Sequence, residues 1–400
     1  MVLAGNHAWK PTNPLVPKYA CMNLRLVQEA EMVHVRFGIW SAALALALTA
    51  STGALAIPTV QTYAVTTSAL GADNPAIWGN YVVWQAVGPG GTDIFAGVLG
   101  TGDLPTSSIL TVCTSAGTQS MPTVGQGFVA WEDRRTDSNG NIVAASANWG
   151  TGTFTSFNVA TRSGAEIAPC INGDILFYNY NASSYNPNTV YTIAAYDLAS
   201  RTALLNVASS SAAKGPAAAS SSYVVWHDAR AGTGNRDIWG YNRSSHGSVQ
   251  ITSFAGSQLY PAIFGNMVAW TELIGGYYKV GFMEVGGAVT YVPGGSFDMQ
   301  APSIYGDFIV WADNRNGNWD VYAYQISTGE QFLVAGGAGD QDKPKIFADK
   351  IVFRTVSGMT TQINYAVLSA AAPAVPEPSS LAALLSGVLA AAGIIRRRSR

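Results

Sequence analysis

The stretch PSIYGDFIVWADNRNGNWDVYAYQI, from Pro302 to Ile326, decides the fold of this chain. Pro302 opens a short apolar segment, and a strand can begin with proline because no ladder donor is needed there. The pair Gly306-Asp307 supplies the residues of a tight hairpin turn. An unbroken apolar run then ends at Trp311, and a polar loop leads to another strand from Asp320. Continuous apolarity predicts a strand that is covered on both faces.

The same pattern occurs seven times. Its copies begin at prolines that lie 41 to 47 residues apart, namely Pro75, Pro122, Pro169, Pro216, Pro261, Pro302 and Pro344. Each unit predicts four short strands, and helical periodicity is absent. Four-stranded units at this period indicate a β-propeller. The sequence therefore predicts an all-β chain with a single seven-bladed propeller. Six blades remain the alternative, because the third and seventh units lack the tryptophan.

The two ends of the repeat region complement each other. The seventh unit ends after its third strand, QINYAVL, and the orphan segment Val60–Ala69 resembles the fourth strands of other units. If this segment pairs with the last unit, the ring closes without an exposed strand edge.

The most conspicuous polar motif is W-x-D-x-R. It is intact in three units, as Trp131-Asp133-Arg135, Trp226-Asp228-Arg230 and Trp311-Asp313-Arg315. These carboxylates could form a catalytic or metal-binding ring. Repeated acid–base pairs favour a structural role instead, in which the carboxylate accepts loop N–H groups and the arginine ties the loop to a neighbouring blade. The same holds for the acids that open third strands, Asp93, Asp237 and Asp320.

Five tryptophans end the apolar strands in a fixed phase: Trp84, Trp131, Trp226, Trp270 and Trp311. Exposed aromatic rings could form a sugar-stacking surface. Their fixed place at the end of a buried strand favours packing between blades.

A set of polar residues precedes the prolines and predicts a ligand face. Four units carry an amide or acid three residues before the proline, and Tyr260 lies in one of the same connections; the candidates are Gln119, Glu166, Gln258, Tyr260 and Gln341. Chain direction places them on the same face as the D-x-R loops, around the mouth of a central channel. Amides suit hydroxyl-rich ligands, but these groups could equally close hydrogen bonds between blades.

Several functional classes find no support in the sequence. Residues 57–374 hold 14 Lys and Arg against 21 Asp and Glu, so nucleic acid is not an expected partner. Only His227 and His246 fall in this region, which argues against a histidine-rich metal site. No Asp box, G-x-S-x-G elbow, P-loop or H-E-x-x-H motif is present. We expect no catalytic residue, no metal and no cofactor, and we expect Cys113 and Cys170 to be buried free thiols.

Two parts of the sequence resemble known protein families, namely the repeat region and the C-terminal tail. The segment YGDFIVWADNRNGNWDVYAYQI resembles the repeat of TolB-like propellers, and the likeness covers about residues 58–370. This implies a fold found in periplasmic and cell-surface proteins, but no single function.

The N-terminal region predicts export. His34 and Arg36 precede the apolar run FGIWSAALALALTA, and an A-x-A site follows at Ala54–Ala56. We therefore expect residues 1–31 to be an upstream extension that is not native, residues 32–56 to be a signal peptide, and the mature chain to begin at Ile57.

The tail VPEPSSLAALLSGVLAAAGIIRRRSR, from Val375 to Arg400, holds Pro376-Glu377-Pro378, an uncharged apolar run and a basic end with Arg396, Arg397 and Arg398. This combination resembles the PEP-CTERM sorting signal of Gram-negative bacteria. The resemblance implies processing by an exosortase. Residues 57–370 are then the propeller, 371–378 a linker with the motif, and 379–400 a sorting helix that anchors an intermediate in the inner membrane before release to the cell surface or the extracellular matrix.

Two functions remain open. The first is a non-catalytic binding or scaffold module for extracellular polysaccharide or an envelope protein. The second is a carbohydrate-active hydrolase or lyase, because carboxylates at the channel mouth could lie within catalytic distance of each other. Few acids escape the repeat pattern, which favours the module.

Overall fold

The computed structural model describes residues 57–66, 71–136, 138–160, 164–182, 191–204, 206–208, 212–232 and 234–369. They belong to one compact unit, Ile57–Pro373. The predicted extension 1–31, signal peptide 32–56, linker 371–378 and sorting helix 379–400 lie outside the described residues. Within these described ranges, no helix is long and apolar enough to cross a membrane.

Consecutive strands pair antiparallel, as the hairpin signals predict. The first two repeat units form one eight-stranded sheet that consists of two four-stranded meanders. Its strands are β2 (Asp73–Trp78), β3 (Tyr81–Gly88), β4 (Gly91–Val98), β5 (Leu110–Cys113), β6 (Gly117–Val124), β7 (Phe128–Asp133), β8 (Asn141–Asn148) and β9 (Thr153–Ala160). A short parallel contact, Gly91–Gly117 and Thr92–Thr118, joins the two meanders. The 3₁₀ helix η1 (Thr106–Ser108) lies between β4 and β5.

The remaining units form five sheets of four strands each. The first two of these sheets hold β10 (Ala165–Asn172), β11 (Ile175–Asn181), β12 (Thr192–Asp197), β13 (Thr202–Ala203), and β14 (Ala218–Ala219), β15 (Tyr223–Asp228), β16 (Asp237–Asn242), β17 (Gly247–Gln250). The next two hold β18 (Gln258–Phe264), β19 (Met267–Ile274), β20 (Tyr277–Glu284), β21 (Thr290–Tyr291), and β22 (Met299–Tyr305), β23 (Phe308–Asp313), β24 (Asp320–Gln325), β25 (Glu330–Ala335). The last holds β26 (Asp340–Phe347), β27 (Lys350–Ser357), β28 (Thr360–Ser369) and β1 (Thr59–Ala64).

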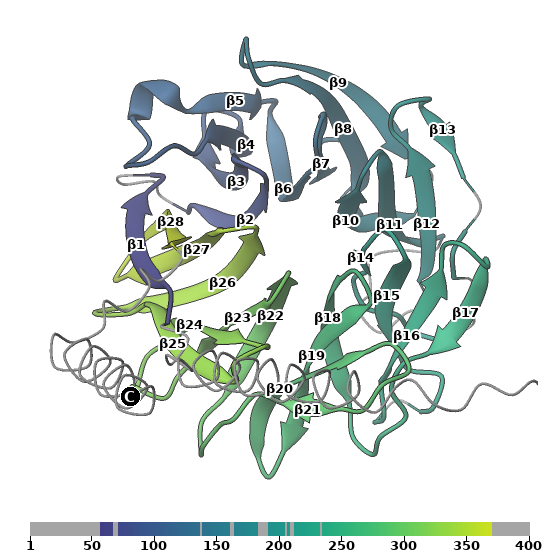
Figure 1. The fold of residues 1–400 in the computed structure, drawn as a ribbon. Helices are drawn as coiled ribbons and strands as arrows, with labels where there is room; N and C mark the ends of the chain where they lie inside the picture. Colours follow the sequence, from purple (N-terminus) through teal and green to yellow (C-terminus); the bar gives the residue numbers. More distant parts are fainter. Residues whose placement is uncertain are drawn as a thin grey trace, which may run out of the picture. The chain divides into compact units, whose positions relative to one another are not determined.

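The meanders are arranged around a common centre, with the first strand of each unit innermost (Figure 1). Buried apolar clusters lie between successive meanders. One of them joins the last sheet to the first, because Val352 and Tyr365 pack with Val82 and Trp84. All five repeat tryptophans lie within these clusters or beside them with at most 1% of their surface exposed. Burying such large rings removes much apolar area from water, which stabilises each interface between meanders.

The N-terminal strand completes the last sheet, as the repeat pattern predicts. β1 pairs antiparallel with β28 from Thr59 opposite Ser369 to Ala64 opposite Asn364. The rings of Tyr63 and Tyr365 lie 5.1 Å apart across this pair. The expected pairing of Val60–Ala69 is therefore present as far as Ala64, while residues 67–70 lie outside the description. Strands from the two ends of the repeat region thus share one sheet.

Candidate functional site

The predicted ligand-face residues differ sharply in exposure. Gln119, Glu166 and Gln258 are fully buried and Gln341 is 4% exposed, whereas Tyr260 is 58% exposed. Gln258 shows what the burial achieves, because its amide donates to Glu272 Oε1 at 3.1 Å and accepts from Thr252 Oγ1 at 2.9 Å. The burial of the four amides and acids leaves them almost no surface to offer to a ligand. Tyr260 is the member that offers its surface to a ligand.

Tyr260 owes its exposure to a β-bulge that recurs in the innermost strands. Six residues that directly precede the repeat prolines have φ between 47° and 53°: Asn74, Met121, Ala168, Tyr260, Ala301 and Lys343. The strand register shifts at each of these positions. A left-handed conformation is unfavourable for residues with a Cβ, and more so before proline, so the surrounding structure must hold it in place.

Side chains from the preceding repeat unit hold three of these bulges. In three units the residue that follows the repeat tryptophan reaches the N–H of the pre-proline residue in the next unit. Gln85 Oε1 accepts from Met121 at 2.9 Å, and Glu132 Oε1 accepts from Ala168 at 2.8 Å. His227 Nδ1 accepts from Tyr260 at 3.2 Å. We call Gln85, Glu132 and His227 the collar residues. Sequence reasoning missed them, although their fixed position after the tryptophan was a signal.

Burial controls the protonation of two collar residues. Desolvation raises the pKa of the Glu132 carboxyl, and the Ala168 N–H and Arg134 only partly oppose this effect. Desolvation, helped by the positive charge of Arg236, lowers the pKa of His227 to about 4. A neutral His227 fits its role as acceptor for the Tyr260 N–H. The His227 ring also explains why residue 215 is a glycine, because a Cβ at Gly215 would lie 1.9 Å from Cε1 of His227.

Ion pairs connect the first and last meanders near the same bulges. Lys343 Nζ lies 2.6 Å from Asp73 Oδ1, and Arg354 Nη1 lies 3.1 Å from the same oxygen. Arg354 also pairs with Asp342 at 2.6 Å. These four side chains are partly exposed, so each pair contributes modestly to stability, but together they place charge of both signs at the closure of the ring.

The W-x-D-x-R residues form compact units within their own loops. Asp133, Asp228 and Asp313 each accept from the indole two residues earlier and pair at 2.6 Å with the arginine two residues later. The sequence predicts that the arginine ties its loop to a neighbouring blade, and the ion pairs themselves close within the loop. Two hydrogen-bonding partners occupy each of these carboxylates, which supports a structural role.

The two cysteines are free and lie in different sheets, Cys113 on β5 and Cys170 on β10. Cys113 is buried as expected, but Cys170 is only partly so. Desolvation nevertheless raises the pKa of the Cys170 thiol to about 11, so it is protonated and unreactive near neutral pH. In the part of the chain that the structure describes, no three His, Cys, Asp or Glu side chains gather to hold a metal ion.

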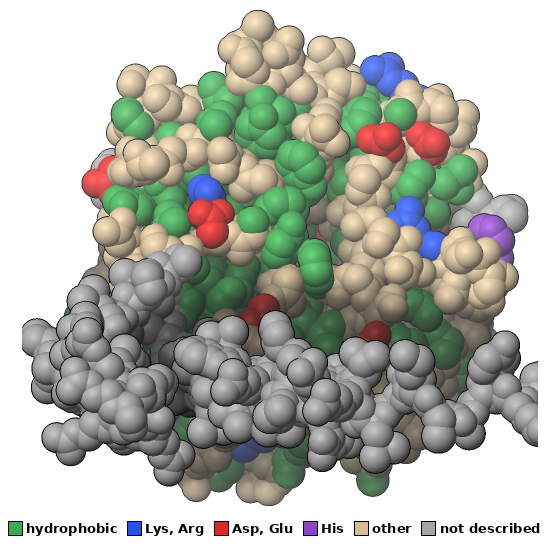
Figure 2. All heavy atoms as spheres, viewed as in Figure 1, with side chains coloured by type: hydrophobic (Ala, Val, Ile, Leu, Met, Phe, Trp, Pro, Cys, Tyr) green, Lys and Arg blue, Asp and Glu red, His purple; other side chains and the backbone are tan. Residues whose placement is uncertain are grey.

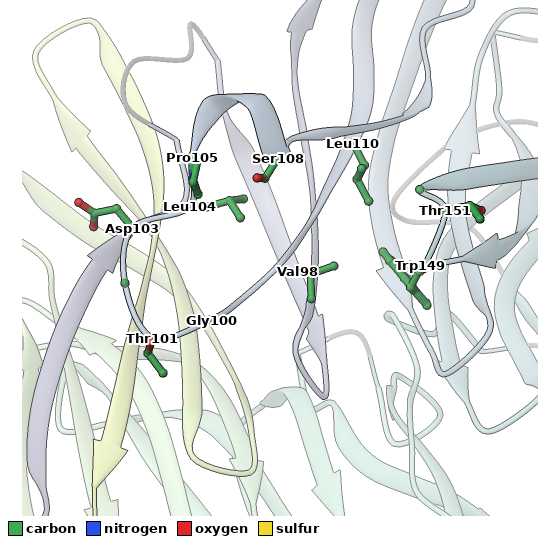
Figure 3. A pocket seen from close by; sticks show the side chains of 13 residues that line it. Val98, Gly100, Thr101, Asp103, Leu104, Pro105, Ser108, Leu110, Trp149 and Thr151 are labelled. Carbon is green, nitrogen blue, oxygen red and sulfur yellow. The ribbon is translucent and has the colours of Figure 1, made fainter.

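A cavity of about 470 Å³ lies away from the predicted face, between the loop that joins β4 to β5 and the β8–β9 hairpin. Val98, Leu104, Leu110 and Trp149 point toward it (Figure 3). Thr101, Ser108 and Thr151 lie at its exposed rim. Sequence analysis did not single out any of these residues, because most of them stand in connections whose lengths vary between units and Val98 and Leu110 lie at the ends of their strands.

Comparisons with known proteins support the fold. No family model and no curated protein matches the sequence. The β-propeller domain of the Trilobed protease from Pyrococcus furiosus is similar at 10% identity and a TM-score of 0.56, over 78% of this chain and 100% of that one. The acylaminoacyl peptidase of Pyrococcus horikoshii is similar at 11% identity and a TM-score of 0.54, over 71% of this chain and 49% of that one.

This chain thus spans about half the length of that peptidase. TolB from Acinetobacter baumannii is also similar, at 16% identity and a TM-score of 0.45, over 77% of this chain and 70% of that one. At such identities the two stronger similarities show the fold alone. The chain has an all-β, propeller-like fold.

Proposed function

We propose that residues 57–370 form a seven-bladed propeller that acts as a non-catalytic binding or scaffold module. The blade count is supported by the seven four-stranded meanders and by the buried cluster that links Trp84 of the first to Tyr365 of the last. Each meander then corresponds to one repeat unit, including the third and seventh, in which Tyr178 and Phe353 replace the tryptophan.

The observation that carries the non-catalytic proposal is the saturation of the repeat carboxylates. Asp133, Asp228 and Asp313 are 2% exposed or less, and each is bound by an indole and a guanidinium. Glu272 is held in the same way by Trp270 and Gln258. A carboxylate with these fixed partners is poorly placed to donate a proton or attack a sugar.

A carbohydrate-active hydrolase or lyase is the alternative, and one observation favours it. Burial raises the pKa of the Glu132 carboxyl, and the general acid of glycoside cleavage is a carboxyl with a raised pKa. Its Oε1 is already engaged by the Ala168 N–H, and the residue is only 5% exposed. These features support a structural role for Glu132 over a catalytic one.

We also propose that the protein is exported and sorted. The signal peptide at residues 32–56 and the Pro376-Glu377-Pro378 motif support this proposal. The partners would be an exosortase during processing and then extracellular polysaccharide or an envelope protein. The location would be the inner membrane transiently, followed by the cell surface or the extracellular matrix.

The experiment that separates the two functions measures retention and turnover together. The full chain, purified in detergent, is incubated with neutral and acidic polysaccharides, and both bound protein and new reducing or unsaturated ends are measured. Retention without new ends supports the module. New ends that disappear in Glu132→Gln or Glu166→Gln would instead assign an enzyme.

A further inference from the structure

The cavity beside Trp149 is preformed. Its β4–β5 loop is fixed to the last sheet, because Leu104 N donates to Ala64 O at 2.8 Å and the Tyr365 hydroxyl donates to Gly102 O at 2.7 Å. On the other wall, Gly152 has a φ of 67°, which favours glycine, and a Cβ there would lie 2.8 Å from Leu110. A ligand that enters this cavity does not need to order these walls, which reduces the entropic cost of binding.

Trp149 is held as a rigid platform at the edge of the cavity. Its ring stacks on Tyr81 with centroids 4.1 Å apart and planes inclined by 7°, and Phe154 meets it edge-on at 5.5 Å. Its Nε1 donates to Gln126 O at 3.2 Å. All three rings are only partly buried. An aromatic ring with a fixed orientation and accessible surface offers stacking without loss of rotamer entropy.

A row of aromatic side chains continues from this stack, although the rings beyond Trp78 are tilted against one another by 43° to 52°. Beyond Tyr81, the centroids of successive rings lie 4.4–6.2 Å apart along Trp78, Phe347, Tyr305 and Phe264. Each of these four ends the innermost strand of its unit, at β2, β26, β22 and β18, opposite the end that carries Tyr260 and its equivalents. None is fully buried, and Phe264 is 38% exposed. We call the rings from Trp149 to Phe264 the aromatic row.

The chemistry of the cavity and the row selects among ligands. No Lys or Arg lines the cavity, so nothing there would neutralise a phosphate backbone or a polyanion. Charged side chains are scattered on the face that Figure 2 shows, among apolar and uncharged ones. Hydroxyls of Thr101, Ser108 and Thr151 surround an apolar floor with a tryptophan beside it. A sugar has apolar ring faces that pack on aromatic surfaces. It also has hydroxyls that can hydrogen-bond to polar side chains at the rim of a cavity.

We propose that the cavity and the aromatic row bind a neutral polysaccharide, with one or a few sugars in the cavity beside Trp149 and the following sugars along the row. The inference rests on the proposed function as a binding module and places its ligand at a site other than the predicted mouth. The paired strands offer little free edge for a peptide to extend. The row follows the innermost strands around their common centre and is one ring wide, which suits a chain of sugar rings better than a protein surface does.

The test uses the full chain in detergent and calorimetric titration with neutral disaccharides and hexasaccharides of glucan, xylan and mannan. Ser108→Trp would fill the cavity, and Ser107→Trp is its matched control, because Ser107 is exposed on the same 3₁₀ helix but does not line the cavity. We expect at least one hexasaccharide to bind the wild type and the control equally. Ser108→Trp should weaken that binding at least tenfold, and so should Trp149→Ala.

Phe264→Ala tests the row separately, because Phe264 is its far end. We expect this variant to weaken the hexasaccharide about threefold to tenfold and to leave the disaccharide unchanged. Glycan binding that Ser108→Trp leaves intact would overturn the site but not the module. Absence of binding to every neutral glycan, or displacement of the glycan by apolar peptides, would overturn the glycan assignment. Turnover of the sugars would instead overturn the proposed non-catalytic function.

Discussion

The indole Nε1 of Trp311 donates a hydrogen bond to Oδ2 of Asp313 at 3.0 Å, and both side chains are fully buried. The same pairing recurs as Trp131 with Asp133, Trp226 with Asp228, and Trp270 with Glu272. A buried indole N–H needs an acceptor, and the acid two residues later supplies it. The third and seventh units have Tyr178 and Phe353 in place of the tryptophan, and they also lack the acid. The first unit is an exception, because it has Trp84 but carries Ala86 at the position of the acid.

Replacing Asp313 should therefore destabilise the protein more than an exposed acid would. Asp313→Ala leaves the buried Trp311 N–H without an acceptor and removes the ion pair of Arg315, which keeps only Gln331 as a partner. We expect it to lower the free energy of unfolding by about 2–3 kcal/mol. Glu284→Ala, at an exposed position of β20, should change it by less than about 0.5 kcal/mol. Urea unfolding measures both. The double variant Trp311→Phe, Asp313→Ala should lose less than the sum of the single changes, and strict additivity would contradict the coupling.

The repeat made the sheets, the buried tryptophans and the pairing of β1 with β28 predictable. Each depends on a local pattern that recurs with a fixed period, so hairpin turns and apolar runs carry the information. The burial of Gln119, Gln258 and Gln341 was not predictable in this way. Each of these residues lies two positions before a bulged residue. A bulge changes which side chains face the interior of the sheet.

The aromatic row was hidden for a different reason. Trp78, Tyr305 and Phe347 were visible as members of the repeat, but their contacts join different units, and the contact of Trp78 with Phe347 joins strands from opposite ends of the chain. Trp149 stands in a hairpin whose length no periodicity fixes. A sequence alone does not give the distances between such residues, since these follow from ring closure and from the packing of neighbouring sheets.

His227 should make stability depend on pH between about 6.5 and 4. Its pKa in the folded protein is about 4, below the ordinary value of 6.5, because burial disfavours the charged ring. Its stabilising contribution is fully present above the unfolded pKa of about 6.5 and is lost as the pH falls through the folded pKa near 4. The loss amounts to about 3 kcal/mol.

The variant His227→Asn isolates this contribution, because its Oδ1 can still accept from the Tyr260 N–H while the side chain does not titrate. Carboxylates also titrate in this range, so the measured quantity is the difference between wild type and variant in urea unfolding at pH 7, 6, 5 and 4. We expect the wild type to lose more stability over the interval. Parallel curves for the two proteins would show that His227 is not buried in its neutral form.

Deletion of β1 should lower the melting temperature and promote aggregation. Without Thr59–Ala64, the long strand β28 becomes an exposed edge and loses the Tyr63–Tyr365 contact. The Ala64 N–H that binds Asp103 Oδ1 at 2.7 Å is also lost, which frees the loop beside the cavity. Deletion of Ile57 and Pro58, which precede β1, is the control and should have little effect. Equal melting temperatures for the two deletions would mean that β28 does not depend on its partner.

The sorting proposal predicts that insertion and release can be separated. Glu377→Ala leaves the apolar run Leu381–Ile395 unchanged, and hydrophobicity alone drives insertion of such a segment into a membrane. In a host that has an exosortase, we expect the variant to reach the membrane but to stay there, while the wild type is released with a mature N-terminus at Ile57. Mass spectrometry of the cell-surface and membrane fractions measures both ends of the chain. Peptides from Leu381–Ile395 in the released wild type would show that the tail is a permanent anchor and not a sorting signal.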